Sequence, residues 1–373
     1  MTLPVDPSLG VSTLCAVHRL PLLESRSAVY EDWPPRPSDF DSIPRLRDSA
    51  GRQYTYLRLS VTDRCDLACV YCMPPGGEED HARRRALLSF EEAARVVSVF
   101  AAAGIRRVRF TGGEPLVRKD IVRLVELVHR RTEVEELVMT TNATRLGELA
   151  RPLRDAGLSG VNISIDTLDS ERFSAITRGG DLGRVLAGIH AALDVGLDVK
   201  LNTVPLAGHN DDELAAIVDY AWANGVTPRF IELMPLGEGA KLPAETRMNA
   251  QDVLAQLGDR VGDSGGQGVH GHGPARYFQA RDGSGRRVGF ITPMSNEFCD
   301  DCNRVRVTAR GDIRACLASR RAVSLRDIMR AGGSDLDMAW AMVWSLSGKA
   351  SGHYFSDPEV DEHENVGMSL IGG

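Results

Sequence analysis

The sequence predicts an α/β fold: an incomplete, TIM-like (βα)6 barrel followed by a smaller α+β domain that covers its open side. Short β-branched or apolar runs alternate with segments of helical spacing from residue 56 to residue 233, a pattern typical of βαβ units with a parallel sheet. The alternation gives six units, fewer than the eight that close a full barrel. This pattern changes from about residue 240, and residues 263–274 form a glycine-rich stretch that reads as a loop. We therefore expect an irregular leader at 1–44, the barrel at 45–238 and a second domain at 239–373.

The leader is rich in proline and holds seven of the 18 prolines of the chain. Proline fixes φ and removes a backbone donor, so a regular helix or strand is not expected there. The first residues lack the basic and apolar regions of a secretory signal. The one cysteine of the leader, Cys15, is expected to be inert because a reactive thiol needs an electropositive setting.

Composition indicates a protein of the reducing cytoplasm that binds neither membranes nor nucleic acids. No apolar run approaches the ~20 residues that a membrane helix needs. The net charge of -7 argues against a broad nucleic-acid surface, which is usually basic. Six of the seven cysteines fall into two triplets rather than disulfide-like pairs. In a reducing compartment such thiols stay available as ligands.

The barrel elements can be placed from these patterns. Strands are expected at 56–61, 106–110, 136–140, 160–165, 197–204 and 227–233. Helices are expected at 89–103, 119–130, 145–156, 182–195 and 211–224. Ser89 and Glu92 form the capping box of the first helix, and a hairpin is expected to turn at Asp282–Gly285. In a parallel α/β sheet the chemistry gathers at the C-terminal strand ends, so we expect the site in the loops that follow the strands.

The first cysteine triplet follows the first strand as C-x3-C-x2-C, at Cys65, Cys69 and Cys72. Three thiolates can hold three irons of a 4Fe–4S cluster and leave the fourth iron open for a small molecule. Structural zinc normally takes four protein ligands, and the nearest further candidate, His81, lies outside the loop. The spacing therefore favours a cluster, with zinc as the alternative.

The second cysteine triplet, C-x2-C-x13-C, lies in the C-terminal part at Cys299, Cys302 and Cys316. C-x2-C is a common zinc pattern, and His270 or His272 upstream could supply a fourth ligand. The residues alone leave zinc and an iron–sulfur cluster equally open.

Several motifs together resemble a known family. The first triplet with Tyr71 before its last cysteine resembles the signature of the radical S-adenosylmethionine (SAM) superfamily. The longer string LRLSVTDRC followed by YCMP resembles the GTP 3',8-cyclase family, lyases of molybdenum cofactor biosynthesis. TGGEP at 111–115, RFIELMP at 229–235, CNRVR at 302–306 and the final Gly-Gly extend the resemblance over residues 43–373. Asp66 and Arg107 depart from the family pattern, but these departures leave the cysteine ligands of the cluster unchanged.

The resemblance implies an activity and its cofactors. In the family, an electron enters the first 4Fe–4S cluster, SAM is cleaved, and a 5'-deoxyadenosyl radical removes the C3' hydrogen of GTP. The C3' radical then attacks C8 of guanine and gives 3',8-cyclo-7,8-dihydro-GTP. The implied cofactors are SAM and two 4Fe–4S clusters, the second contacting the purine through its open iron. The implied partners are an electron donor and a downstream cyclic pyranopterin monophosphate synthase, and a homodimer is compatible with the family.

The resemblance also assigns roles to individual residues. The implied SAM contacts are Tyr71, Gly113, Ser164 and Met234. The implied GTP contacts are Arg58, Arg109, Thr140, Lys200, Arg304 and Arg306. Gly372 and Gly373 form a tail that enters the active site of the family, so its deletion is expected to abolish cyclisation and spare cluster binding.

Each assignment has a plainer alternative. Gly113 could serve a turn, Ser164 a polar cap and Met234 core filling. Arg304 and Arg306 could lie on a solvated strand face. The cations facing the barrel interior could instead pair with Asp166 or Glu232, because a buried charge needs a partner. At the level of the whole protein, the alternatives are a two-cluster radical SAM enzyme acting on a peptide and a non-enzymatic zinc protein.

Overall fold

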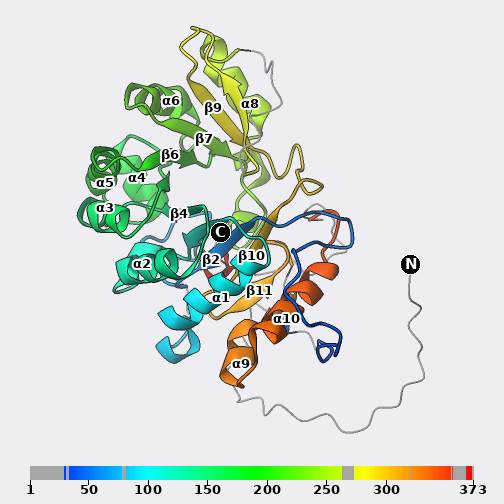
Figure 1. The fold of residues 1–373 in the computed structure, drawn as a ribbon. Coiled ribbons are helices and arrows are strands. Elements are labelled where there is room, and N and C mark those ends of the chain that lie inside the picture. The colour runs from blue at the N-terminus through cyan, green and yellow to red at the C-terminus, as the bar shows by residue number, and fades with distance from the viewer. Residues whose placement is uncertain are drawn as a thin grey trace.

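The computed structural model describes residues 29–30, 33–77, 81–262, 273–319, 321–353, 355 and 367–371. Its strands form one 12-stranded sheet in the order β1-β12-β11-β10-β2-β3-β4-β5-β6-β7-β9-β8. The helices α1 to α6 follow the outer side of the curved sheet (Figure 1). Among the described helices, none combines the length and apolar character needed to cross a membrane.

The centre of the sheet is the predicted set of six parallel strands. They are β2 (Tyr56–Ser60), β3 (Arg107–Thr111), β4 (Glu136–Thr141), β5 (Gly160–Ser164), β6 (Asp198–Thr203) and β7 (Thr227–Ile231). The helices outside them are α1 (Phe90–Ala102), α2 (Ile121–Arg131), α3 (Leu146–Asp155), α4 (Ser170–Thr177), α5 (Leu182–Asp194) and α6 (Leu214–Ala223). The (βα)6 prediction is confirmed.

Local chemistry explains where the structure departs from the expected helix bounds. The capping box of Ser89 and Glu92 starts α1 as predicted. The second helix begins two residues late because Asp120 has a left-handed backbone, with φ of 60°. Helix α4 was not predicted, since eight residues give little periodicity. Its only clear signal is Asp169, whose side chain accepts a hydrogen bond from the Arg172 amide.

The C-terminal part lengthens the barrel sheet at both edges. At the β7 edge, β9 (Arg287–Ile291) pairs parallel with β7 and antiparallel with β8 (Arg276–Gln279), which confirms the predicted hairpin. At the β2 edge lie β10 (Arg304–Val307), β11 (Asp312–Arg314), β12 (Arg321–Ser324) and β1 (Val29–Tyr30). The predicted boundary between the barrel at 45–238 and a second domain at 239–373 stays a prediction.

The remaining elements flank these edges. Helices α7 (Glu238–Lys241) and α8 (Ala250–Leu257) follow β7, and α9 (Leu325–Arg330), α10 (Asp335–Ser347) and α11 (Met368–Ile371) follow β12. In Figure 1, α8 lies with the β9 hairpin at one end of the molecule, and α9 and α10 lie at the other. Short 3-10 turns occur at Arg84–Ala86, Pro115–Val117, Asp211–Glu213, Ala244–Thr246 and Gly258–Arg260.

Side-chain alternation along the strands separates core from site. In β2, Leu57 and Leu59 are fully buried in the main apolar cluster, together with Val97 and Phe100 of α1. Tyr56 and Arg58 point the other way and line a cavity on the inner face of the sheet. The outer face therefore carries the hydrophobic packing, and the inner face is left for polar chemistry.

Candidate active site

Both cysteine triplets open into one cavity of about 560 Å³ on the inner face of the sheet. Its lining includes all six cysteines of the triplets, which are thiols of intermediate exposure rather than disulfides. It also includes the ten other residues predicted to contact SAM or GTP: Arg58, Tyr71, Arg109, Gly113, Thr140, Ser164, Lys200, Met234, Arg304 and Arg306. The last two residues of the tail, Gly372 and Gly373, lie outside the described residues.

The first cysteine loop is fixed by turns of its own and by α4. The amides of Cys72 and Met73 both donate to the Cys69 carbonyl, at 2.9 and 3.1 Å. The amides of Ala68 and Val70 donate to carbonyls at the end of α4. Arg178 follows α4 and donates from Nη1 to the carbonyls of Ala68 and Met73. The helix that sequence reasoning missed thus holds the loop that carries the first triplet.

Strand pairing assembles the second triplet. Cys299 and Cys302 share a turn in which the Cys302 amide donates to the Cys299 carbonyl at 3.2 Å. In the antiparallel pair β10–β11, Arg306 lies opposite Arg314. Cys316, two residues after Arg314, is therefore brought back level with Arg304, next to Cys302.

The two triplets lie at opposite ends of neighbouring strands. Strand β10 pairs parallel with β2, with Arg304 opposite Tyr56 and Arg306 opposite Arg58. Cys302 precedes β10, whereas Cys65 follows β2. The cavity between them is therefore floored by the inward side chains of these strands. This parallel pairing joins residues far apart in the chain, and no local sequence pattern predicts it.

The electrostatic surroundings of the two triplets differ. Burial raises the pKa of Cys65 to about 12, and burial raises that of Cys299 to about 11. At Cys302 burial acts in the same direction, but the charges of Arg304 and Lys349 outweigh it and lower the pKa to about 6. One thiolate of the second triplet is therefore stabilised by cations before any metal binds.

The spread of the sulfur atoms bears on the zinc alternative. Sulfur atoms around one tetrahedral zinc at 2.3 Å lie about 3.8 Å apart. Among the described residues, which include both triplets, one group alone has three ligand atoms within 4.8 Å of one another: Glu297, Cys299 and His353. Each triplet is thus more widely spread than the ligands of a single ion. The residues fit a larger centre such as a 4Fe–4S cluster, which three thiolates can hold.

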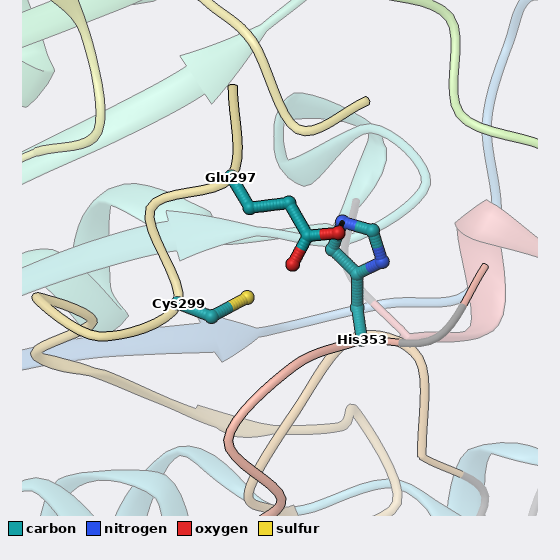
Figure 2. Close-up of side chains that lie close together, drawn as sticks. All are labelled: Glu297, Cys299 and His353. Carbon is teal, nitrogen blue, oxygen red and sulfur yellow. Dashed lines mark ion pairs between the residues drawn. The ribbon is translucent and has the colours of Figure 1, made fainter. Parts of the chain in front are cut away.

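The trio around Cys299 is not arranged as a metal site either. Figure 2 shows Glu297 and Cys299 on one loop and His353 facing them from the C-terminal segment. Nε2 of His353 lies 2.6 Å from the Pro293 carbonyl oxygen, and Nδ1 accepts a hydrogen bond from the Phe355 amide at 3.2 Å. Both ring nitrogens are therefore already used, and His353 ties two segments together. The other histidines considered for zinc, His270 and His272, lie outside the described residues.

The residues predicted to meet SAM lie beside the first triplet. A Cβ atom at Gly113 would lie 2.4 Å from the Arg64 carbonyl oxygen, so only glycine fits. The hydroxyl of Tyr71 donates to Asp166 at 2.7 Å. The neighbouring Glu114 is fully buried and accepts hydrogen bonds from Thr141 and from the amides of Leu116 and Asn142. Burial raises its pKa to about 7.

The residues predicted to meet GTP form a cationic floor. Register places Arg306, Arg58 and Arg109 side by side on β10, β2 and β3. Burial lowers the pKa of Arg306 to about 10, helped by the charge of Arg304. Burial also lowers the pKa of Arg58 well below its ordinary value, with Arg306, Arg109 and Arg304 acting in the same direction. Such crowding of like charge is typical of a site for an anion.

The internal salt bridges considered as an alternative do not form at Arg109. Its guanidinium donates to Tyr56, to the Met139 carbonyl and to the Thr140 hydroxyl. Asp166 accepts instead from Tyr71 and from the Val204 amide. Glu232 accepts from Ser295 and from the amides of Ala250, Met294 and Ser295. Lys200 pairs with its strand neighbour Asp198.

Sequence reasoning missed four further cations that line the cavity: Arg52, Arg229, Arg287 and Lys349. Arg229 is 8% exposed, and its Nε and Nη2 atoms have no hydrogen-bond partner among the described residues. It begins the RFIELMP motif, so the motif itself could have drawn notice to it. Lys349 lies outside every motif, and only the fold brings it to Cys302.

Asp166 should make the stability of the metal-free protein depend on pH. Burial raises its pKa to about 6 from the ordinary 3.8. Between these values the unfolded chain is ionised while the folded one keeps its proton, so this group's contribution to stability falls as pH rises, by about 3 kcal/mol in total. Asp166→Asn keeps an oxygen for the Val204 amide and an amide for Tyr71. The variant should therefore exceed the wild type in stability above about pH 6.

Urea unfolding of both proteins at several pH values measures this effect. The gap in unfolding free energy should widen from about pH 4 to pH 6 and stay constant above. A gap that does not change with pH would contradict the assignment to Asp166.

Comparison with known proteins finds matching families and relatives over most of the chain. Residues 59–221 match the radical SAM superfamily, and residues 226–355 match the family described as Molybdenum Cofactor Synthesis C. A protein of Heliobacterium modesticaldum named GTP 3',8-cyclase is 44% identical over 337 residues, which are 87% of this chain and 99% of the relative. A protein of the same name from Syntrophomonas wolfei is 38% identical over 329 residues, covering 88% and 100%.

A solved structure shares the fold at low identity. The chain resembles the crystal structure of Streptococcus suis SuiB bound to the precursor peptide SuiA, with a TM-score of 0.53 and 14% identity. The likeness covers 79% of this chain and 67% of that chain. At this identity it supports the barrel architecture alone.

Proposed function

Because the chain belongs to the GTP 3',8-cyclase family of radical SAM enzymes, we propose that it converts GTP to (8S)-3',8-cyclo-7,8-dihydroguanosine 5'-triphosphate. This would make it a lyase of the first step of molybdenum cofactor biosynthesis. The observation that carries the proposal is the single cavity into which both cysteine triplets open, with a floor of arginines between them. A peptide substrate would not need this concentration of buried positive charge, and the wide spread of the thiols disfavours zinc.

The family implies a 4Fe–4S cluster and SAM, and the first triplet fits them. Cys65, Cys69 and Cys72 would hold three irons and leave the fourth for the amine and carboxylate of SAM. When bound, these cofactors supply a reactive carbon radical at the 5' position of the adenosyl group. The protein contributes position and the exclusion of water.

The chain's own residues would orient SAM. Gly113 lets the backbone approach the ligand closely, because no Cβ fits there. The hydroxyl of Tyr71 is held by Asp166, so the ring is already oriented for contact with the ligand. Ser164, at the end of β5, and Met234, after β7, line the same cavity from strands on either side of β6.

The cationic floor would hold the triphosphate of GTP. Arg58, Arg109 and Arg306 present guanidinium groups from three adjacent strands, and planar forks of this kind suit phosphate oxygens. Arg304, two residues before Arg306 on β10, and Lys200 on β6 would add positive charge, and Thr140 on β4 would add a hydroxyl. The bound anion would also relieve the repulsion among the arginines.

The second triplet would hold a second 4Fe–4S cluster that faces the purine. Cys299, Cys302 and Cys316 lie at the other end of the cavity from the first triplet, so a nucleotide between them would meet both. The tail would close the site: Met368 and Ser369 already line the cavity, and Ser369 and Ile371 are 2% and 1% exposed. Gly372 and Gly373 follow directly and would reach the reacting groups.

An anaerobic assay tests the proposal. Reconstituted protein, SAM, GTP and dithionite should yield methionine, 5'-deoxyadenosine and the cyclised nucleotide, with GTP-dependent formation of the last two. Zinc in place of iron, or no cyclised nucleotide from iron-loaded protein, would refute it. An electron donor, a downstream cyclic pyranopterin monophosphate synthase, a homodimeric state and a cytoplasmic location complete the proposal.

A further inference from the structure

Lys349 lies against the second cysteine triplet, although no motif contains it. It follows α10, and its Nζ atom is 3.3 Å from Sγ of Cys302 and 3.3 Å from the Arg304 carbonyl oxygen. The same ammonium lies 4.8 Å from the centre of the Tyr54 ring. The lysine is therefore packed between an aromatic face and a prospective metal ligand, rather than extended into solvent.

The backbone of Lys349 is fixed relative to the triplet by Arg52. Nη2 of Arg52 donates to the carbonyls of Lys349 and Ala350, at 3.3 and 3.0 Å, and Nη1 donates to the Cys299 carbonyl at 2.8 Å. Nε of the same guanidinium forms an ion pair with Oδ2 of Asp48 at 2.5 Å. One buried arginine thus spans the segment that carries Lys349 and the turn that carries Cys299 and Cys302.

A cation at this place would act on the electron affinity of a cluster. Reduction adds one electron and one negative charge to the cluster and its thiolates. Hydrogen bonds to the sulfurs and nearby positive charge favour the reduced state and raise the reduction potential. Lys349 supplies both at one sulfur, because its ammonium donates to Sγ of Cys302.

We propose that Lys349 is a positioning residue of the second 4Fe–4S cluster, which donates a charge-assisted hydrogen bond to the Cys302 sulfur and thereby raises the cluster's reduction potential. The inference rests on the proposed function, because it presumes that the second triplet holds a cluster. It adds a residue outside the motifs, and the potential is a property that a merely structural lysine would leave unchanged.

The test isolates the second cluster in the full-length chain. Cys65, Cys69 and Cys72 are all changed to alanine, and iron per chain is measured after reconstitution. One-electron reduction of the second cluster by dithionite is then followed by electron paramagnetic resonance. The parent triple variant is compared with the same protein carrying Lys349→Met, Lys349→Gln or Lys349→Arg. Lys119→Met is the matched control, because Lys119 is exposed and loses the same charge away from the cavity.

The expected result is a more negative midpoint for Lys349→Met. When half of the cluster is reduced, the ratio of reduced to oxidised redox mediator should be about tenfold higher than for the parent. This ratio corresponds to a midpoint potential that is about 59 mV more negative for a one-electron couple. Lys349→Arg and Lys119→Met should stay near the parent. Should Lys349→Met fail to hold iron, the shift is read from Lys349→Gln, which keeps a donor without the charge.

Two results would overturn different statements. An unchanged midpoint in Lys349→Met or Lys349→Gln, with about four irons still bound as one cluster requires, would overturn the role of Lys349. Zinc, or no iron, in the parent triple variant would overturn the second cluster itself and with it that part of the proposed function.

Discussion

Replacing Cys69 by alanine should abolish the cleavage of SAM to 5'-deoxyadenosine and methionine. Cys69 is central to the first triplet, and its carbonyl closes the turn that places Cys72. Two thiolates would remain for a cluster that needs three from the protein. The surroundings offer no ready substitute, because the one close grouping of three ligand atoms among the described residues is Glu297, Cys299 and His353, which lies beside the second triplet rather than this loop.

The measurement combines iron analysis with chromatography of the products. Iron per chain should fall by about half, since the second triplet keeps its share of two four-iron clusters. Cys15→Ala is the matched control and should behave as the wild type, because the lone cysteine of the leader is expected to be inert. Undiminished 5'-deoxyadenosine from Cys69→Ala would contradict the assignment of the first triplet.

Replacing Arg306 by methionine should weaken GTP binding and yet stabilise the nucleotide-free protein. Loss of a hydrogen bond to a charged group costs about 1.5–3 kcal/mol, or roughly 10- to 100-fold in affinity. The pKa of Arg306 is lowered to about 10 by burial and by the charge of Arg304, so the folded protein without ligand holds this cation at a cost. Removing the charge relieves that cost while keeping much of the apolar stem.

Titration calorimetry with GTP and thermal unfolding test both halves of this prediction. The unfolding temperature without nucleotide should rise by about 1 °C for each kcal/mol gained in a chain of 373 residues, and the stabilisation by added GTP should shrink. Arg123→Met is the matched control, because Arg123 lies exposed on α2 and pairs with Glu91. Equal affinity for GTP in the Arg306 variant and the control would remove Arg306 from the phosphate site.

Much of the barrel could be predicted from the sequence because its signals are local. Alternation of β-branched runs with helical spacing places each of the six strands to within a residue or two, and glycines and caps mark the helix ends. Helix α4 escaped because its periodicity is brief, although its end holds the first cysteine loop through Ala68 and Val70. One expected helix start fails because Asp120 adopts a left-handed backbone, and another fails because Asp211–Glu213 form a 3-10 turn before α6.

The candidate site is less predictable because long-range pairing builds it. The motifs identify the cysteines and, by resemblance, most of the cations. They do not predict that β10 pairs with β2, that Arg52 clamps the segment carrying Lys349, or that Arg229 is buried with two nitrogens unpartnered among the described residues. These contacts join segments far apart in the chain, and each depends on the completed sheet.

The pairing of β10 with β2 has a consequence during synthesis. The ribosome releases β2 at residue 60 but β10 only at residue 304, so the nascent barrel carries β2 as a bare edge, and β7 as another until β9 emerges. Exposed strand edges recruit other chains. A fragment ending near residue 238 should therefore associate rather than stay monomeric, because both edges of its sheet lack the strands that cover them in the full chain.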